Sequence, residues 1–156
     1  MRPGITSLLA ILASVFLPTI ATAQDPSGYG PGREKLIGAW HLVSIESPGP
    51  DGKLNHFTDI KGQLIYTRDG HMSVQLMYPP SQSNLSNDYV LNGYEASFGT
   101  YEVDEGTHIV THHVEASVTR GLVGKDLARA FHFSNGNLII KSVRPNEHWA
   151  VTWKPD

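Results

Sequence analysis

Three polar residues in the second half of the chain are best suited to chemistry. His113 and Glu115 lie two positions apart in a predicted strand, so their side chains point to the same face, and Arg129 begins the next predicted strand. Beside an apolar interior, such a group could hold the carboxylate, phenol or keto oxygen of a ligand through charge-assisted hydrogen bonds. His113 and Glu115 could also act as general acid and base in an enolisation or cyclisation. A third interpretation is structural, with Glu115 and Arg129 forming an ion pair between adjacent strands.

The eight histidines do not form a metal-binding pattern. His112 and His113 are consecutive in a predicted strand, so they point to opposite faces and cannot bind one ion together. The sequence has no cysteine, which excludes disulfides and thiolate metal sites. It also lacks the Gly-x-Ser-x-Gly motif of hydrolases, a phosphate-binding loop and a dinucleotide fingerprint. We therefore expect no metal and no cofactor.

Strands and tight turns must position these side chains. Runs of alternating apolar residues predict eight strands, at 38–47, 62–68, 71–77, 97–103, 107–117, 129–134, 137–143 and 148–154. The turn signals between them are Arg68-Asp69-Gly70, Asp104-Glu105-Gly106 and Asn135-Gly136. Short helical segments are expected at 33–37 and in the loops at 88–95 and 125–128.

Eight short strands in sequence order predict an all-β fold, a single up-and-down antiparallel barrel that closes on itself. Long connections at 48–61, 78–96 and 118–128 alternate with tight turns. Because alternate connections of such a barrel lie at the same end, one end is expected to be closed and the other to be a mouth. Long loops around a mouth often bind ligands.

Side-chain alternation predicts which residues line the barrel. A three-residue turn at 68–70 pairs Tyr66 with Met72, and a similar turn at 104–106 places His113 inside. The ligand-binding residues predicted in this way are Tyr66, Met72, Val74, Tyr101, Thr111, His113, Glu115, Arg129 and Phe131. Of these, His113 and Glu115 are the candidates for catalysis.

The predicted faces depend on register. A slip of one residue would place His112 inside and His113 outside. In the first strand, alternation from Trp40 places Glu46 inside as well, near the mouth.

The first predicted strand opens with Gly38-Ala39-Trp40, which is the Gly-x-Trp pattern of lipocalins. The segments that accompany it in the same order are 36–46, 62–77, 98–104 and 110–115. Over residues 36–154 the chain resembles the lipocalin-like domain family of small bacterial and fungal barrel proteins. This resemblance implies a barrel with a pocket, in which Gly38 and Trp40 close the blunt end. It implies no single activity, because the family is defined by its fold.

The first 23 residues have the three parts of a signal peptide: a cation at Arg2, an apolar run at 5–17, and the small residues Ala21-Thr22-Ala23 before the cleavage point. The apolar run is shorter than the roughly 20 residues of a membrane-spanning helix. We therefore expect an exported protein, bacterial and periplasmic or extracellular, without stable membrane insertion. Residues 24–35 would be a flexible leader, and residues 36–156 the barrel domain.

The charge of the chain bears on its partners. The formal net charge is −3 and there are no basic runs, which argues against a nucleic-acid partner.

The predicted function is an exported lipocalin-like protein that binds a small hydrophobic ligand in an apolar cup with a polar rim. We expect a binding protein rather than an enzyme. Two alternatives stay open: a small isomerase, cyclase or hydratase that uses His and Glu in the same pocket, and an envelope or stress protein with a filled core and no ligand. The oligomeric state is not predicted.

Overall fold

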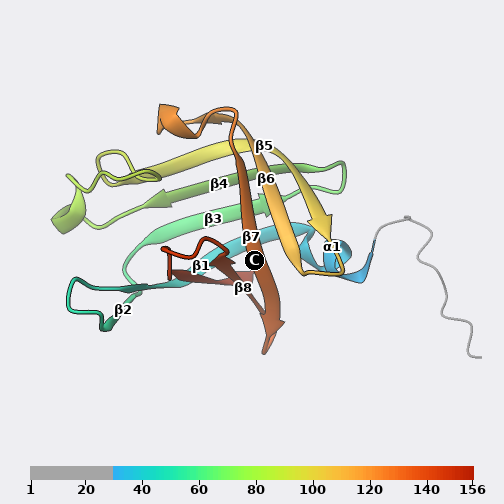
Figure 1. Ribbon diagram of the computed structural model, residues 1–156, viewed down its shortest axis with the longest axis horizontal. Helices are drawn as coiled ribbons and strands as arrows, with labels where there is room; N and C mark the ends of the chain where they lie inside the picture. Colours follow the sequence, from blue (N-terminus) through green and yellow to red (C-terminus); the bar gives the residue numbers. More distant parts are fainter. Residues whose placement is uncertain (1–29) are drawn as a thin grey trace, which may run out of the picture.

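The computed structural model describes residues 30–156, which form one short α-helix, nine strands and two 3-10 turns (Figure 1). The predicted signal peptide and the first part of the leader lie outside the described residues. The elements are α1 Pro31–Leu36, β1 Gly38–Pro48, β2 Leu54–Phe57, β3 Lys61–Tyr66, β4 His71–Met77, η1 Pro80–Gln82, β5 Tyr94–Asp104, β6 Ile109–Ser117, η2 Arg120–Leu122, β7 Asp126–Ser134, β8 Asn137–Ser142 and β9 Ala150–Pro155.

Eight of these strands close into an antiparallel barrel. Their order around the sheet is β1-β3-β4-β5-β6-β7-β8-β9, and β1 also pairs with β9. β2 is an extra strand that pairs with the second half of β1, after the segment of β1 that pairs with β3. The predicted barrel and its strand order are therefore confirmed. β2 escaped prediction because Leu54–Phe57 is short and exposed along most of its length, so it has no apolar alternation.

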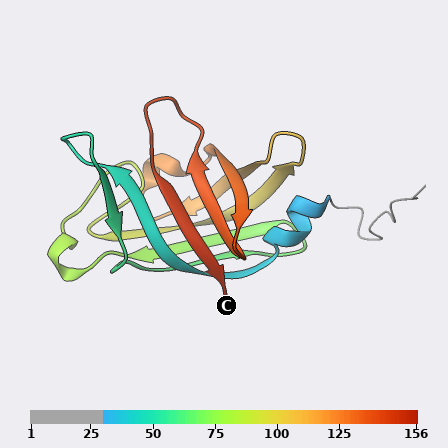
Figure 2. The same ribbon diagram turned by 90° about the horizontal axis from the view of Figure 1, so that it is seen from below.

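The two ends of the barrel differ in their connections. The long connections at 49–53, 78–93, 118–125 and 143–149 gather toward the left of Figure 1, whereas the turns after β3 and β5 lie on the right with α1. Figure 2 shows α1 at that same end of the barrel. The left end is called the mouth below, and the right end the closed end. None of the helices within residues 30–156 is long and apolar enough to cross a membrane.

Large apolar side chains fill the closed end. Trp40 is 6% exposed, and its indole Nε1 donates a hydrogen bond to the Leu36 carbonyl oxygen at 2.8 Å. Gly38 has φ of 141°, a backbone conformation that other residues rarely adopt, which explains the glycine two positions before this tryptophan. The Glu105 carboxylate accepts hydrogen bonds from the backbone N–H groups of Gly32 and Arg33, and so holds α1 against the barrel.

Turn length determines which side chains enter the barrel. The β3–β4 turn has the predicted three residues, and Tyr66 pairs with Met72. The β5–β6 turn has four residues, 105–108, because Asp104 pairs with Ile109. Compared with the predicted turn at 104–106, the β6 register shifts by an odd number of residues, and the side chains of β6 from Ile109 to Glu115 change face.

A bulge follows farther along the same pair of strands. The register shifts between Phe98 and Gly99, where Glu115 has no partner on β5. A Cβ atom at position 99 would lie 2.0 Å from the His113 carbonyl oxygen, so only glycine fits there.

Two of the three predicted helical segments are wrong. Residues 88–93 form a loop in which the Asn87 side chain accepts the backbone N–H groups of Tyr89 and Val90, and β5 begins at Tyr94. Residues 126–128 belong to β7, whose tertiary pairing with β6 overrides a weak local preference. The helical turn expected at 33–37 is confirmed as α1, two residues earlier.

Candidate ligand-binding cavity

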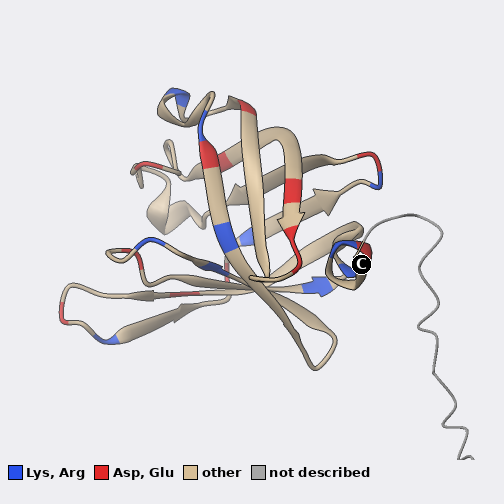
Figure 3. Cartoon of the chain, turned by 45° about the vertical axis from the view of Figure 1, so that its right-hand side comes forward, with Lys and Arg blue, Asp and Glu red and all other residues tan. Residues whose placement is uncertain are grey.

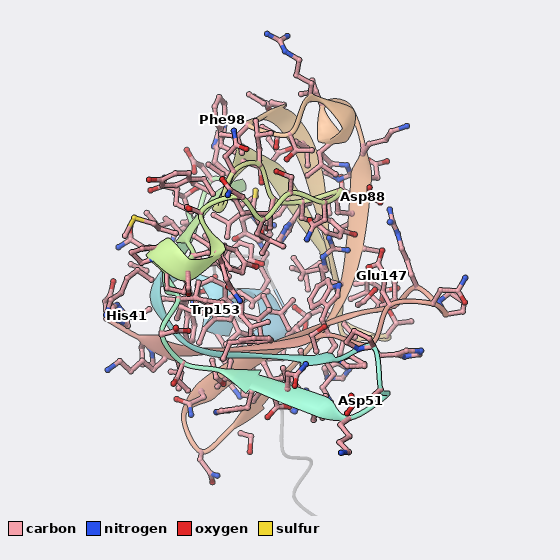
Figure 4. The ribbon with its side chains drawn as sticks, turned by 90° about the vertical axis from the view of Figure 1, so that its left-hand side faces the viewer. His41, Asp51, Asp88, Phe98, Glu147 and Trp153 are labelled. Atoms are coloured by element: carbon pink, nitrogen blue, oxygen red, sulfur yellow. The ribbon has the colours of Figure 1, made fainter. Side chains whose placement is uncertain are left out.

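A cavity of about 340 Å³ lies inside the barrel at the mouth. This volume falls near the lower end of the roughly 300–1,000 Å³ typical of small-molecule sites. Figure 4 looks onto this end, where Asp51, Asp88 and Glu147 mark three of the connections around the mouth and Trp153 lies near the centre of the view. The interior is therefore filled at the closed end and hollow at the mouth.

The cavity has two unlike walls. β1, β3 and β9 contribute mostly apolar side chains, including Ile45, Leu64 and Val151. β5, β6 and β7, which lie opposite in the barrel order, contribute Glu95, Ser97, His112 and Arg129. A molecule in this space would meet hydrocarbon on one side and polar groups on the other. Outside the barrel, charged residues of both signs are scattered over the described strands and loops (Figure 3).

Arg129 is the central charged group of the polar wall. It is 6% exposed, and its guanidinium carbon lies 5.3 Å from the ring centre of Tyr89 and 4.9 Å from that of Trp149. One N–H group donates to the Ala128 carbonyl oxygen at 3.1 Å. No carboxylate of residues 30–156 lies within ion-pair distance of it. Arg129 is thus a buried cation with aromatic partners but no anionic one, an arrangement that favours binding an anion.

Glu95 is the acidic residue of the cavity wall. Burial raises its pKa to about 7, although the positive charge of Arg129 acts in the opposite direction. Its carboxyl group is therefore partly protonated at neutral pH and does not permanently neutralise Arg129.

His112, which lines the cavity together with Arg129 and Glu95, forms a buried pair with Tyr66. The Tyr66 hydroxyl lies 2.6 Å from His112 Nε2. Burial, with smaller contributions from the charges of Arg129 and His113, lowers the pKa of His112 to about 3. Burial also raises the pKa of Tyr66. Both side chains are consequently neutral at physiological pH and add hydrogen-bonding capacity without charge.

Glu147 fastens the connections around the mouth. Its carboxylate accepts hydrogen bonds from the Tyr89 hydroxyl at 3.1 Å, Ser142 Oγ at 2.8 Å, Trp149 Nε1 at 3.1 Å and Arg144 Nη1 at 2.9 Å. One carboxylate thereby joins the 78–93 connection to the 143–149 connection. It also holds the two rings against which the Arg129 guanidinium packs.

The predicted site residues separate into three groups. Val74 and Arg129 line the cavity, whereas Tyr66, Met72, Tyr101 and Phe131 are buried toward the closed end. The Tyr101 hydroxyl donates to the Thr67 carbonyl oxygen at 2.9 Å, so it is already satisfied by the protein. Thr111, His113 and Glu115 lie on the outer face of β6, whose inner face carries Val110, His112 and Val114.

The predicted cluster of His113, Glu115 and Arg129 is therefore not formed. His113 Nδ1 lies 2.7 Å from an oxygen of Asp126 on the outside of the barrel, and Glu115 is exposed. The cause is the four-residue β5–β6 turn described above, which places His112 inside instead. The ion pair considered between Glu115 and Arg129 is excluded for the same reason.

Glu46 was also placed on the wrong face. In β1, Leu42 pairs with Trp153 and Ser44 with Thr152, so Val43 is an extra residue that reverses the alternation. Ile45 consequently lines the cavity, while Glu46 pairs with His56 at 3.3 Å on the outside.

Sequence reasoning missed Glu95, Tyr89, Glu147 and Trp149. Alternation could have found Glu95, since it continues inward from Tyr101, Gly99 and Ser97; the helix expected at 88–95 hid it. Tyr89 and Glu147 lie in connections, where no periodicity predicts direction, whereas Trp149 belongs to the predicted strand at 148–154 and alternates with Val151 and Trp153, which also line the cavity.

An eight-stranded barrel with a hollow, partly polar interior at one end defines a class of proteins that can hold one small ligand. Residues 37–154 match the lipocalin-like domain family, and the chain belongs to this family. The family shows the fold and does not specify a ligand.

Comparisons with solved structures give distant similarities. A lipocalin-like protein from Bacteroides uniformis is 11% identical, with a TM-score of 0.46, and the match covers 78% of this chain and 99% of that one. A protein from Bacteroides eggerthii is 13% identical, with a TM-score of 0.47 and the same coverage of 78% and 99%. A mutant of the fluorescent protein UnaG is 10% identical, with a TM-score of 0.41, over 78% of this chain and 96% of that one. No curated protein matches the sequence.

Proposed function

We propose that this chain is an exported protein that binds a small hydrophobic molecule with a polar oxygen group inside its barrel. The observation that carries the proposal is the cavity of about 340 Å³ with one apolar wall and one polar wall. A ligand's hydrocarbon part would leave water against the apolar wall, which contributes about 2.5 kcal/mol per 100 Å² of apolar surface before ordering costs. Its oxygen would face β5, β6 and β7.

Two cavity side chains have unused hydrogen-bonding atoms. Trp153 Nε1 and Gln82 Oε1 are buried and have no partner among the described residues, and both residues border the cavity. Buried polar groups in native proteins nearly always have partners. A bound molecule offering an acceptor to Trp153, or a donor to Gln82, would supply one.

Binding can be tested with a panel of lipophilic acids, phenols and alcohols by native mass spectrometry and thermal shift. The wild-type protein should bind some of them one to one and melt at a higher temperature. Ser97→Phe, which fills the cavity from β5, should abolish the shift. Ala96→Phe adds the same ring one residue along the strand, on its outer face, and should retain it. Absence of any bound species in the wild type, or equal binding by both variants, would contradict the proposal.

Export rests on the signal-peptide pattern of residues 1–23. When the full chain is made in bacteria, the protein recovered from the periplasm or the medium should begin at Gln24. The intact mass and the N-terminal peptide check this. Recovery of a chain that still begins at Met1 would contradict it.

Glu95 favours a second candidate function, an isomerase, cyclase or hydratase for a small keto compound. A carboxyl group whose pKa is raised to about 7 in a cavity is well placed to take a proton from the carbon beside a carbonyl group. Arg129 would then stabilise the enolate oxygen. Glu95→Gln should abolish turnover of such a compound while changing its affinity by no more than about tenfold. Binding without turnover of any keto compound supports the carrier instead.

A further inference from the structure

We infer that the molecule bound in this cavity is an organic acid whose carboxylate pairs with Arg129 while its hydrocarbon part lies against β1, β3 and β9. This deepens the proposed function and rests on it.

The first reason is the charge of Arg129. It is buried on the polar wall and has no carboxylate of residues 30–156 within ion-pair distance. Removing a charge from water without an opposite partner is costly, and the two aromatic rings offset only part of that cost. A ligand carboxylate would compensate the charge in full. A neutral hydroxyl or keto group would not.

The second reason is the way the guanidinium is held. Its central carbon lies 5.3 Å from the ring centre of Tyr89 and 4.9 Å from that of Trp149, so two aromatic rings border it. Its N–H groups point outward in the plane of the group; one donates to the Ala128 carbonyl oxygen, and the group also hydrogen-bonds with the Tyr89 hydroxyl. In-plane N–H pairs of arginine match the two oxygens of a carboxylate. An arginine has five N–H groups, so the bonds to Ala128 and Tyr89 leave others for a ligand carboxylate.

The third reason is the opposite wall. Around the barrel, β7 and its neighbours face β1, β3 and β9, whose side chains Ile45, Leu64 and Val151 are apolar. An acid bound at Arg129 would extend its hydrocarbon part toward them. Glu95, the acidic residue of the cavity wall, makes no ion pair with Arg129 and leaves the site open to a ligand.

The test compares decanoate with decanol and decanamide, which share a chain but differ in charge, by calorimetry at about pH 6, where most Glu95 is protonated. Wild-type protein should bind decanoate about tenfold or more tightly than either neutral compound, since charge-assisted hydrogen bonds are stronger than neutral ones. Arg129→Met should remove this preference and leave decanol binding within about threefold. Arg120→Met, at an exposed arginine on the same end of the barrel, should behave as wild type.

Each outcome separates the two levels of the proposal. Equal binding of decanoate, decanol and decanamide by the wild type would overturn the assignment of an acid and leave hydrophobic binding intact. No binding of these or of the wider panel would overturn the proposed function and the assignment with it. If Arg129→Met does not fold, Arg129→Lys keeps the charge but loses the paired N–H edge, and it should bind decanoate more weakly than wild type and more tightly than decanol. The comparison of decanoate with decanol and decanamide on the wild-type protein does not depend on whether any variant folds.

Discussion

At the closed end of the barrel, aromatic side chains hydrogen-bond to the protein itself, whereas at the mouth they surround a cavity. Trp40 Nε1 donates to Leu36 and the Tyr101 hydroxyl donates to Thr67, so both polar atoms are satisfied within the fold. At the mouth, within residues 30–156, Trp153 Nε1 has no hydrogen-bond partner and Arg129 has no carboxylate within ion-pair distance. The difference is the basis for proposing that some buried polar groups at the mouth bind a ligand, while those at the closed end serve the fold.

The largest expected effect is on the closed end. Trp40→Ala should lower the free energy of unfolding by about 3–5 kcal/mol, because it removes a fully packed ring and leaves a cavity. Trp149→Ala removes a half-buried ring at the mouth and should cost less than about 2 kcal/mol. Urea unfolding measures both. Equal losses would show that the two ends do not divide stability and binding as described.

The next largest effect is expected at Glu147, because its carboxylate joins two of the connections around the mouth through hydrogen bonds. Glu147→Gln should lower the free energy of unfolding by about 1–3 kcal/mol, since several donors lose a charged acceptor. It should also weaken ligand binding, because Tyr89 and Trp149 would no longer be held beside Arg129. Glu102→Gln, at an exposed carboxylate on β5, is the control and should change neither property. A Glu147 variant with unchanged affinity would separate the mouth connections from the binding site.

Glu147 should also make the free energy of unfolding depend on pH in the acid range. Burial alone would raise its pKa, but hydrogen bonds from Ser142, Arg144, Trp149 and Tyr89 lower it below its usual 4.5. The stability that these bonds contribute is present above pH 4.5 and is lost as the pH falls through the lower folded pKa. The free energy of unfolding of Glu147→Gln should therefore vary less with pH in this acid range than that of the wild type.

Glu95 should give a smaller effect at neutral pH. Its pKa is raised to about 7, so ionisation of Glu95 above that pH adds a negative charge beside Arg129 and weakens binding of an acid. Decanoate affinity should fall by about tenfold or less from pH 6 to pH 8. Glu95→Gln should keep its affinity over this range. Glu95 also affects folding stability. Because its pKa is higher in the folded than in the unfolded chain, its contribution to the free energy of unfolding is fully present below the usual pKa of 4.5 and declines as the pH rises toward 7.

Four other residues around the cavity have pKa values moved away from that window. Burial lowers the pKa of His112 to about 3 and, with Glu95 nearby, raises the pKa of Tyr78 to about 12. Burial likewise raises the pKa values of Tyr66 and Tyr89. An affinity for decanoate that falls equally in wild type and Glu95→Gln would contradict the role given to Glu95.

The sequence was sufficient to predict the barrel, its strand order and its two unlike ends, because alternation and turn residues act locally. The pairing of Tyr66 with Met72 is as predicted, and the predicted Asn135-Gly136 turn forms, with Ser134 paired to Asn137. The site was harder to predict. One additional residue in the β5–β6 turn and a bulge at Val43 reversed the faces of β6 and of the end of β1, and neither has a signal in alternation. Tyr89 and Glu147 come together through long connections that periodicity does not describe.

The smallest expected effect concerns the residues that the reversed register moved outside. His113 contacts Asp126 on the outer face, and Glu115 is exposed, so neither touches the cavity. His113→Ala should cost no more than about 1 kcal/mol of stability, the usual range for a surface ion pair, and Glu115→Gln less than about 0.5 kcal/mol. Both should bind decanoate within about twofold of wild type.

His112→Phe, which removes the partner of Tyr66 on the inner face, should cost more stability than either, because it leaves a buried hydroxyl without its bond. Urea unfolding and calorimetry on these variants decide the register independently of any ligand assignment. A larger effect at position 113 than at position 112 would restore the register predicted from a three-residue turn.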